Sequence, residues 1–137
     1  MAGAGAVLLL LGGCATQACT AMGCGGSVGV ELGRLGRPGG QPLTARLCAG
    51  PECTTQTFSP SDPRAVARVE LPTTGGDAPA PSAAVTLRVT QGSTVLVDTA
   101  ATASLSRFAP NGDGCDPICW SAALTLQYGR LVPSPGT

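Results

Sequence analysis

The seven cysteines are the residues of this chain with the most reactive side chains, because a thiolate can act as a nucleophile, bind a metal or form a disulfide. The groups that usually assist such chemistry are missing, since the 137 residues include no histidine and no lysine. This excludes Ser-His-Asp and Cys-His nucleophile pairs, histidine-ligated zinc, Schiff-base chemistry and the lysine of a P-loop. The formal net charge is zero and no basic run occurs, which excludes a nucleic-acid footprint.

Cys14 follows an uncharged apolar run at residues 2–11 and the small residues Gly12 and Gly13. The run has the length of the apolar part of a signal peptide and is too short to cross a bilayer as a helix. This order resembles the bacterial lipobox, which implies that Cys14 becomes the lipidated first residue of an exported chain, held stably by two or more acyl chains. We therefore expect a lipoprotein signal peptide at 1–13, a lipidated tether at 14–26 and attachment to the outer, extracytoplasmic face of the cell membrane.

The positive charge that should open a signal peptide is missing, because no arginine or lysine occurs before Arg34. We expect that a short arginine-bearing stretch belongs before Met1. The alternative is an ordinary buried apolar segment followed by a chance cysteine.

The other six cysteines form an even set in a small exported domain, which is typical of a disulfide framework. Cys48 and Cys53 flank the turn Ala-Gly-Pro-Glu between two alternating segments, so a bridge between them would pin a hairpin. The remaining four allow either local pairs or cross-links between the N-terminal segment and a late loop. The local pairs that we expect are Cys19–Cys24 and Cys115–Cys119.

Two other cysteine chemistries compete with structural disulfides. Cysteine pairs could hold zinc through thiolates, but the two-residue spacing of known sites is absent and the chain is expected outside the cytoplasm. A thioredoxin-like site needs C-x-x-C, and the segment from Cys115 to Cys119 has one residue too many. We therefore expect disulfides, no metal and no cofactor.

Alternation of apolar and polar residues dominates the rest of the chain, and no amphipathic helix of useful length is present. Strands are expected near residues 28–32, 43–47, 54–58, 66–71, 85–89, 94–98, 101–108 and 120–128. They predict an all-β antiparallel β-sandwich of immunoglobulin-like or Greek-key type, with about seven or eight strands, over residues 27–132, before a tail at 133–137. The core is expected to be mostly Val, Leu and Ala around Trp120, Phe58 and Phe108.

Several short motifs together resemble a known family. They are Cys14, the segment Cys-x₄-Cys-Gly-Gly-Ser-Val-Gly-Val, the hairpin Arg-Leu-Cys…Cys-Thr and the late motif Pro-Asn-Gly-Asp-Gly-Cys…Cys-Trp-x-Ala. Over nearly the whole chain they are similar to small actinobacterial secreted lipoproteins of uncharacterised function. The resemblance implies export and a β-sandwich body, and it transfers no catalytic residue.

Other candidate sites have plain structural explanations. The stretch Asn111-Gly-Asp113-Gly-Cys-Asp116 resembles a calcium loop, but it lacks the terminal Glu, and turn chemistry explains the same residues. Trp120 shares a strand face with Leu124 and Tyr128, so we expect it inside rather than stacked on a sugar. Four acids lie on different strands or turns and are expected at the surface: Glu31, Glu52, Glu70 and Asp98. Hydroxyl residues expected on solvated sheet surfaces are compatible with polysaccharide: Thr54, Thr55, Thr57, Thr99, Thr102, Ser104 and Ser106.

These observations predict a lipid-anchored cell-envelope β-sandwich with a non-enzymatic binding or structural role. Its expected partner is an envelope protein or a polysaccharide. The alternative is a small envelope enzyme or thiol redox protein that uses Cys115 and Cys119.

Overall fold

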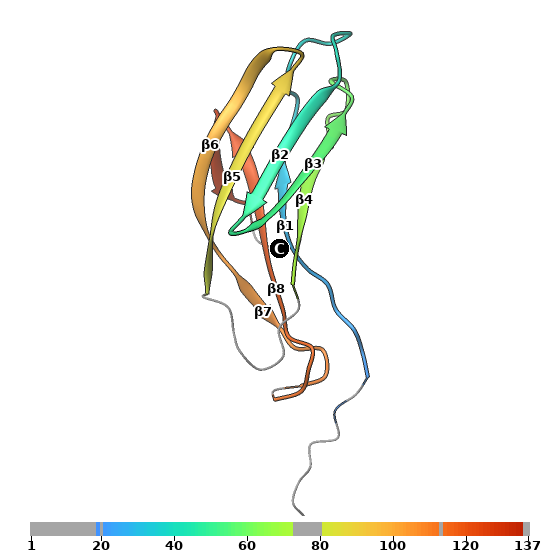
Figure 1. Cartoon of the computed structure of the whole chain (residues 1–137), viewed down its shortest axis with the longest axis vertical. Helices are drawn as coiled ribbons and strands as arrows, with labels where there is room; N and C mark the ends of the chain where they lie inside the picture. Colours follow the sequence, from blue (N-terminus) through green and yellow to red (C-terminus); the bar gives the residue numbers. More distant parts are fainter. Residues whose placement is uncertain (1–18, 20, 73–80, 113, 136–137) are drawn as a thin grey trace, which may run out of the picture.

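The computed structural model describes residues 19, 21–72, 81–112 and 114–135. This described part is all-β, and the predicted antiparallel β-sandwich is confirmed (Figure 1). The strands are β1 (Gly26–Glu31), β2 (Leu43–Ala49), β3 (Glu52–Phe58), β4 (Val66–Leu71), β5 (Ser82–Gln91), β6 (Thr94–Ser104), β7 (Ser106–Phe108), β8 (Cys119–Gln127) and β9 (Arg130–Pro133).

The strands form two sheets that pack face to face. The five-stranded sheet has the order β4-β1-β8-β7, with β9 also paired to β8, and the four-stranded sheet has the order β3-β2-β5-β6. Among the described pairings, only that of β1 with β8 is parallel. Because these strands come from opposite ends of the chain, the parallel pair brings the segment before β1 beside the loop before β8.

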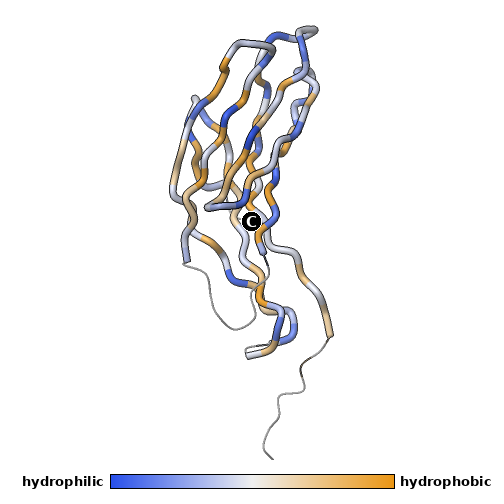
Figure 2. Tube along the Cα trace, viewed as in Figure 1, coloured by the Kyte–Doolittle hydropathy of each residue, from blue (hydrophilic) through white to orange (hydrophobic). Residues whose placement is uncertain are grey.

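The alternation seen in the sequence produces the two-layer form. Burial in β2 and β5 follows a period of two, and Figure 2 shows the matching change of hydropathy along the strands. The buried positions of both sheets meet in one core, and short side chains fill it: Val28, Val30, Leu32, Leu43, Ala45, Leu47, Ala67, Val69, Val85, Leu87, Val89 and Leu124.

Two aromatic residues differ from the expectation. Phe108, expected in the core, is 58% exposed because it ends the short edge strand β7. Tyr128, expected on the inward face of the last long strand, is fully exposed because β8 ends at Gln127 and Tyr128 begins the turn to β9 with a φ of 50°. Trp120 is buried, as predicted.

The expected strands at 94–98 and 101–108 are arranged differently. The strand expected at 94–98 continues without a break to Ser104, and this whole stretch is β6. The chain crosses to the other sheet only at Leu105, before β7. The backbone N–H of Leu105 donates to the carbonyl of Pro81 at 2.9 Å, which fixes the crossing point. No turn residue interrupts the Thr/Ala run between the two segments, so nothing local ends the strand.

A side-chain hydrogen bond connects the two sheets between their edge strands β3 and β4. The Oε1 atom of Gln56 on β3 accepts a hydrogen bond from the backbone N–H of Arg68 on β4 at 2.7 Å. Strand β4 pairs with β1 through its other edge. Gln56 therefore occupies an edge group of β4 that is otherwise open to strand pairing.

Candidate functional site

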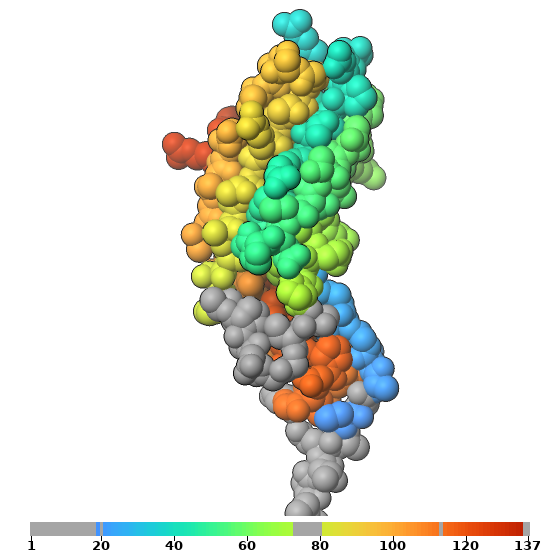
Figure 3. All heavy atoms as spheres, in the orientation of Figure 1, coloured from blue at the N-terminus to red at the C-terminus, as the bar shows by residue number. Residues whose placement is uncertain are grey.

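Two disulfides fasten the segment before β1 to the loop before β8 and to the first residue of β8. Cys19 is bonded to Cys115, with Cα atoms 5.5 Å apart, and Cys24 is bonded to Cys119, with Cα atoms 6.1 Å apart. The expected local pairs Cys19–Cys24 and Cys115–Cys119 are therefore wrong, and the cross-linked alternative is present. We call this end of the molecule, formed by Cys19 and residues 21–25, 109–112 and 114–119, the clamped pole; Figure 3 shows its two segments side by side.

The parallel pairing of β1 and β8 is the physical reason for these cross-links. Val28 lies opposite Ala122 in the register. Cys24 precedes Val28 by four residues and Cys119 precedes Ala122 by three, on strands that run in the same direction. The two cysteines therefore reach the same end of the sheet. Spacing alone favours pairs that are close in sequence and carries no signal for a parallel neighbour.

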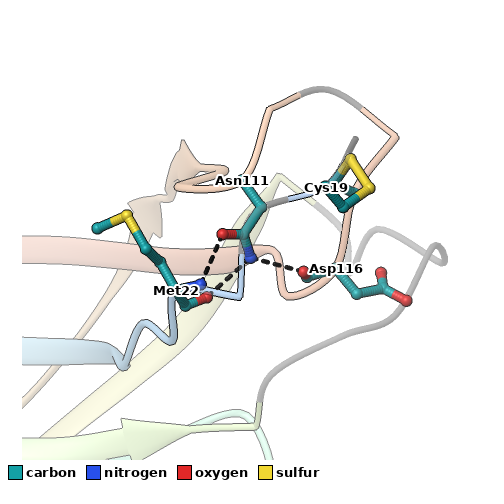
Figure 4. Close-up of a disulfide and its surroundings, with 5 residues drawn as sticks. Cys19, Met22, Asn111 and Asp116 are labelled. Atoms are coloured by element: carbon teal, nitrogen blue, oxygen red, sulfur yellow. Dashed lines mark hydrogen bonds between the residues drawn. A yellow bond between two sulfur atoms is a disulfide. The ribbon is translucent and has the colours of Figure 1, made fainter. Parts of the chain in front are cut away.

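Asn111 adds a polar connection between the same two segments (Figure 4). Its Oδ1 atom accepts a hydrogen bond from the backbone N–H of Met22 at 2.9 Å. Its Nδ2 group donates to the carbonyl oxygens of Met22 and Asp116, each at 2.7 Å. Because Asn111 is only 8% exposed, these bonds are largely shielded from water.

The structure therefore gives Asn111 a role other than the one weighed in the calcium-like loop. Its side-chain oxygen faces the backbone of Met22, and its amide nitrogen bridges two carbonyl groups. Asp113 of that loop lies outside the described residues. In the sequence, Asn111 is recognisable only as part of an Asn-Gly turn dipeptide, which does not indicate a long-range partner.

The two disulfides of the clamped pole have the long span of structural cross-links. Cys115 and Cys119 are each 2% exposed, while their partners are more open, with Cys24 half-buried and Cys19 exposed. By lowering the entropy of the unfolded chain, the first cross-link of this span stabilises the folded protein by about 4.7 kcal/mol. The second cross-link then closes a ring of only about ten residues and adds about 2.7 kcal/mol to the stability of the folded protein.

The third disulfide joins Cys48 and Cys53, as the turn between the two alternating segments predicts. These cysteines are facing residues of β2 and β3.

A mainly apolar cavity of about 280 Å³ lies next to the clamped pole, between the ends of the two sheets. Trp120, which directly follows Cys119, is part of its wall together with Leu71 and Leu105. Glu52 is the one charged side chain among the described lining residues. The Nε1 atom of Trp120 is buried and has no hydrogen-bond partner within the described ranges. The cavity wall thus offers apolar contact rather than a set of acid and base groups.

The four acids considered for catalysis do not converge. In the antiparallel register of β1 with β4, Glu31 lies opposite Val66 and Glu70 opposite Ser27, at opposite ends of the pair. Glu52 and Asp98 belong to the other sheet, where Asp98 lies opposite Arg88. This placement does not supply paired carboxylates at one site.

The outer face of the four-stranded sheet, shown in Figure 3, carries a polar row across the strands. Thr55, Arg46, Arg88 and Asp98 are successive partners on β3, β2, β5 and β6. The last three border a shallow hollow of about 240 Å³. We call these four residues the arginine row. Residue types and spacing do not indicate this row, because strand order decides which residues are neighbours across a sheet.

Two threonines expected on solvated faces lie elsewhere. Thr54 pairs with Leu47 and Thr99 pairs with Leu87, so both are half-buried on the side toward the core. Thr55, Thr57 and Thr102 are exposed, as expected.

Neither a membrane-spanning helix nor a metal cluster is found where the chain is described. In those ranges no helix has the length and apolarity needed to cross a bilayer. The same ranges bring together no group of three or more Cys, Asp or Glu side chains that could hold a metal ion. The expected signal peptide at 1–13 and the lipidation residue Cys14 lie outside the described residues.

Comparison with known proteins identifies no relative. No family model, no curated protein and no solved structure matches the chain. The function is therefore argued from sequence and geometry alone.

Proposed function

We propose that this chain is a lipid-anchored cell-envelope protein whose β-sandwich has a non-enzymatic binding or structural role. The clamped pole is the observation that carries the proposal. Two disulfides and the two hydrogen bonds between Asn111 and Met22 fasten the segment that follows Cys14 to the body. Such a fastening is expected where a chain passes from an anchor into a folded domain, and disulfides persist outside the cytoplasm.

The alternative is an envelope enzyme or redox protein that uses Cys115 and Cys119, and it has less support. Each of these residues is bonded to the N-terminal segment rather than to the other. Reduction would detach that segment from the body, which makes the pair a poor carrier of repeated redox cycles.

The surface that we assign to binding is the arginine row. Its guanidinium, carboxylate and hydroxyl groups offer hydrogen-bond donors and acceptors on a flat sheet face. An envelope polysaccharide or the polar surface of a neighbouring protein fits this chemistry.

The intact mass of the protein extracted from host membranes, with and without reduction before alkylation, tests the anchor. We expect a chain that begins at Cys14, carries a diacylglyceryl-sized increment, and takes up alkyl groups only after reduction. Cys14→Ser should remove the protein from the membrane fraction, whereas the control Cys48→Ser/Cys53→Ser should stay in it. A chain that begins at Met1 with seven alkylatable thiols contradicts the proposal and returns thiolate chemistry to first place.

A further inference from the structure

We infer that the two disulfides of the clamped pole shorten the tether, hold this pole against the bilayer surface and present the opposite pole outward. The inference rests on the lipidation of Cys14 in the proposed function. It adds an orientation of the body and a contact surface, and the partner of that surface is the lipid bilayer itself.

The free chain between the anchor and the body is short. A fully extended chain spans at most about 3.6 Å per residue. Cys19 follows Cys14 by five residues, so the first cross-linked residue lies at most about 18 Å from the lipidated one. Without the disulfides, the first residue held by the body would be Met22, through its hydrogen bonds with Asn111, with a reach of about 29 Å. The cross-links therefore reduce the reach of the tether by more than a third.

The body is longer than this tether. The strands run along the long axis of the molecule, with the clamped pole at one end (Figure 1). The 11 residues of β6 alone extend about 36 Å, twice the reach of the shortened tether. A body attached at one end by a link shorter than itself cannot exchange its two poles at the membrane.

The clamped pole and its border expose apolar side chains. Met22 of the clamped pole is 59% exposed, and Phe108 at the end of β7 is 58% exposed. Phe108 borders the clamped pole because it lies opposite Cys119 in the register. The transfer of large apolar side chains from water to the boundary between headgroups and acyl chains is favourable.

The opposite pole includes the loop before β2, the β5–β6 turn and the β8–β9 turn (Figure 1). Here the side chain of Gln91 holds the loop before β2, with Oε1 accepting from the backbone N–H of Arg37 at 3.0 Å and Nε2 donating to the carbonyl of Gln41 at 2.9 Å. A hollow of about 520 Å³ borders these residues. This pole also exposes apolar side chains, because Val95 is 45% exposed and Tyr128 is fully exposed, so the orientation follows from the tether rather than from a difference between the two surfaces.

Energy transfer to lipid headgroups tests the inference. The lipidated protein is placed in phosphatidylethanolamine–phosphatidylglycerol vesicles that contain acceptor-labelled headgroups, and flotation first establishes that it is attached. A donor dye is coupled through an azide-bearing residue at Ser106, near the clamped pole, or at Ser93, in the distant β5–β6 turn, both of which are exposed. We expect severalfold more transfer from position 106 than from position 93.

Variants then separate the effect of the cross-link from that of the fold. In Cys19→Ser/Cys115→Ser the excess transfer at position 106 should fall by about a third, because the reach from Cys14 to the next residue held by the body, Met22, grows from about 18 Å to about 29 Å. The control Cys48→Ser/Cys53→Ser should leave it unchanged. Ten Gly/Ser residues inserted between Cys14 and Cys19 raise the reach to about 54 Å and should give a larger loss with all disulfides intact, whereas the same insertion after Gly92 should give none.

The contact surface has its own pair of variants. Met22→Ser/Phe108→Ser should lower transfer at position 106, and Val95→Ser, which removes an exposed apolar residue from β6 near the other pole, should not. Equal transfer from both dye positions, or no response to the cross-link and insertion variants, overturns the inference while flotation leaves the anchor intact. Failure to float overturns the proposed function itself.

Discussion

At the scale of single residues, Asn111 joins two segments that lie 89 positions apart in the sequence. Its amide supplies an acceptor for one backbone N–H and donors for two carbonyl oxygens. An ionised aspartate of the same shape has only acceptors, so it would face both carbonyl oxygens without a proton between them.

This difference predicts the outcome of two substitutions. Asn111→Ala should lower the free energy of unfolding by about 2 kcal/mol, because it leaves buried backbone groups without partners. Asn111→Asp should lower it further, since the new charge is buried against carbonyl oxygens. Urea denaturation of the oxidised protein measures both. Asp62→Ala is a control, because the Asp62 carboxylate accepts only a local, exposed bond from the N–H of Arg64, and its cost should stay below about 1 kcal/mol.

Residue identity alone predicts the local part of the candidate site. The Cys48–Cys53 bridge spans one tight hairpin, and the inward position of Trp120 follows from its place in an alternating strand. The partners of Cys19, Cys24 and Asn111 lie at the other end of the sequence, and no local pattern specifies them. The exposure of Phe108 follows from the position of β7 at a sheet edge, which depends on strand order.

At the scale of elements, the backbones of β1 and β8 approach each other closely at Gly26. A Cβ atom built on Gly26 would overlap the carbonyl oxygen of Trp120. At Gly29 in the same strand, a Cβ atom would lie 3.7 Å from the Cγ1 atom of Val66, which is ordinary contact. The two glycines of β1 therefore have different roles despite their similar surroundings in the sequence.

The comparison predicts unequal effects of the same change. Gly26→Ala should destabilise the protein by about 1–3 kcal/mol, because the backbones of β1 and β8 must move apart. Gly29→Ala should be neutral or stabilise it by up to about 1 kcal/mol, because alanine restricts the unfolded chain more than glycine does. Denaturant midpoints of the two variants measure the difference. Equal midpoints would show that β1 does not approach β8 as closely as described.

The strands themselves could be predicted because each alternating segment has a buried face. Alternation shows which side of a strand faces the core, but it is the same for every order of strands in a sheet. The parallel neighbour of β1, the continuous β6 and the arginine row all depend on that order. They could not be predicted from the residues of one strand at a time.

At the scale of the whole molecule, composition and alternation predict the class of fold, because a chain with many short alternating segments and no helix can bury its apolar faces in a sandwich. The closure of the molecule depends on long-range contacts. The cross-links of 96 and 95 residues connect the beginning of the described chain to a loop near its end.

These cross-links predict how a cut chain behaves. A protease site inserted between Thr20 and Ala21 divides the backbone between the two disulfides, yet the fragment that contains Cys19 stays bonded to Cys115. The cut protein should therefore remain on membranes until a reductant is added, and should then be released. A site inserted between Cys14 and Cys19 should release the body with or without reductant. Immunoblots of membrane and soluble fractions measure the result, and release of the first variant without reductant contradicts the bonding described.

The parallel arrangement of β1 and β8 also has a mechanical consequence. A force that pulls on the N-terminal segment enters the body at Cys19 and Cys24 and passes through the disulfides to the loop before β8. The two strands are then drawn from the same end and in the same direction, so the force does not slide one along the other. Because β1 lies between β4 and β8 within the sheet, the load spreads to strands on both sides. The molecule can thus bear traction at its attachment without β1 being pulled out of the sheet.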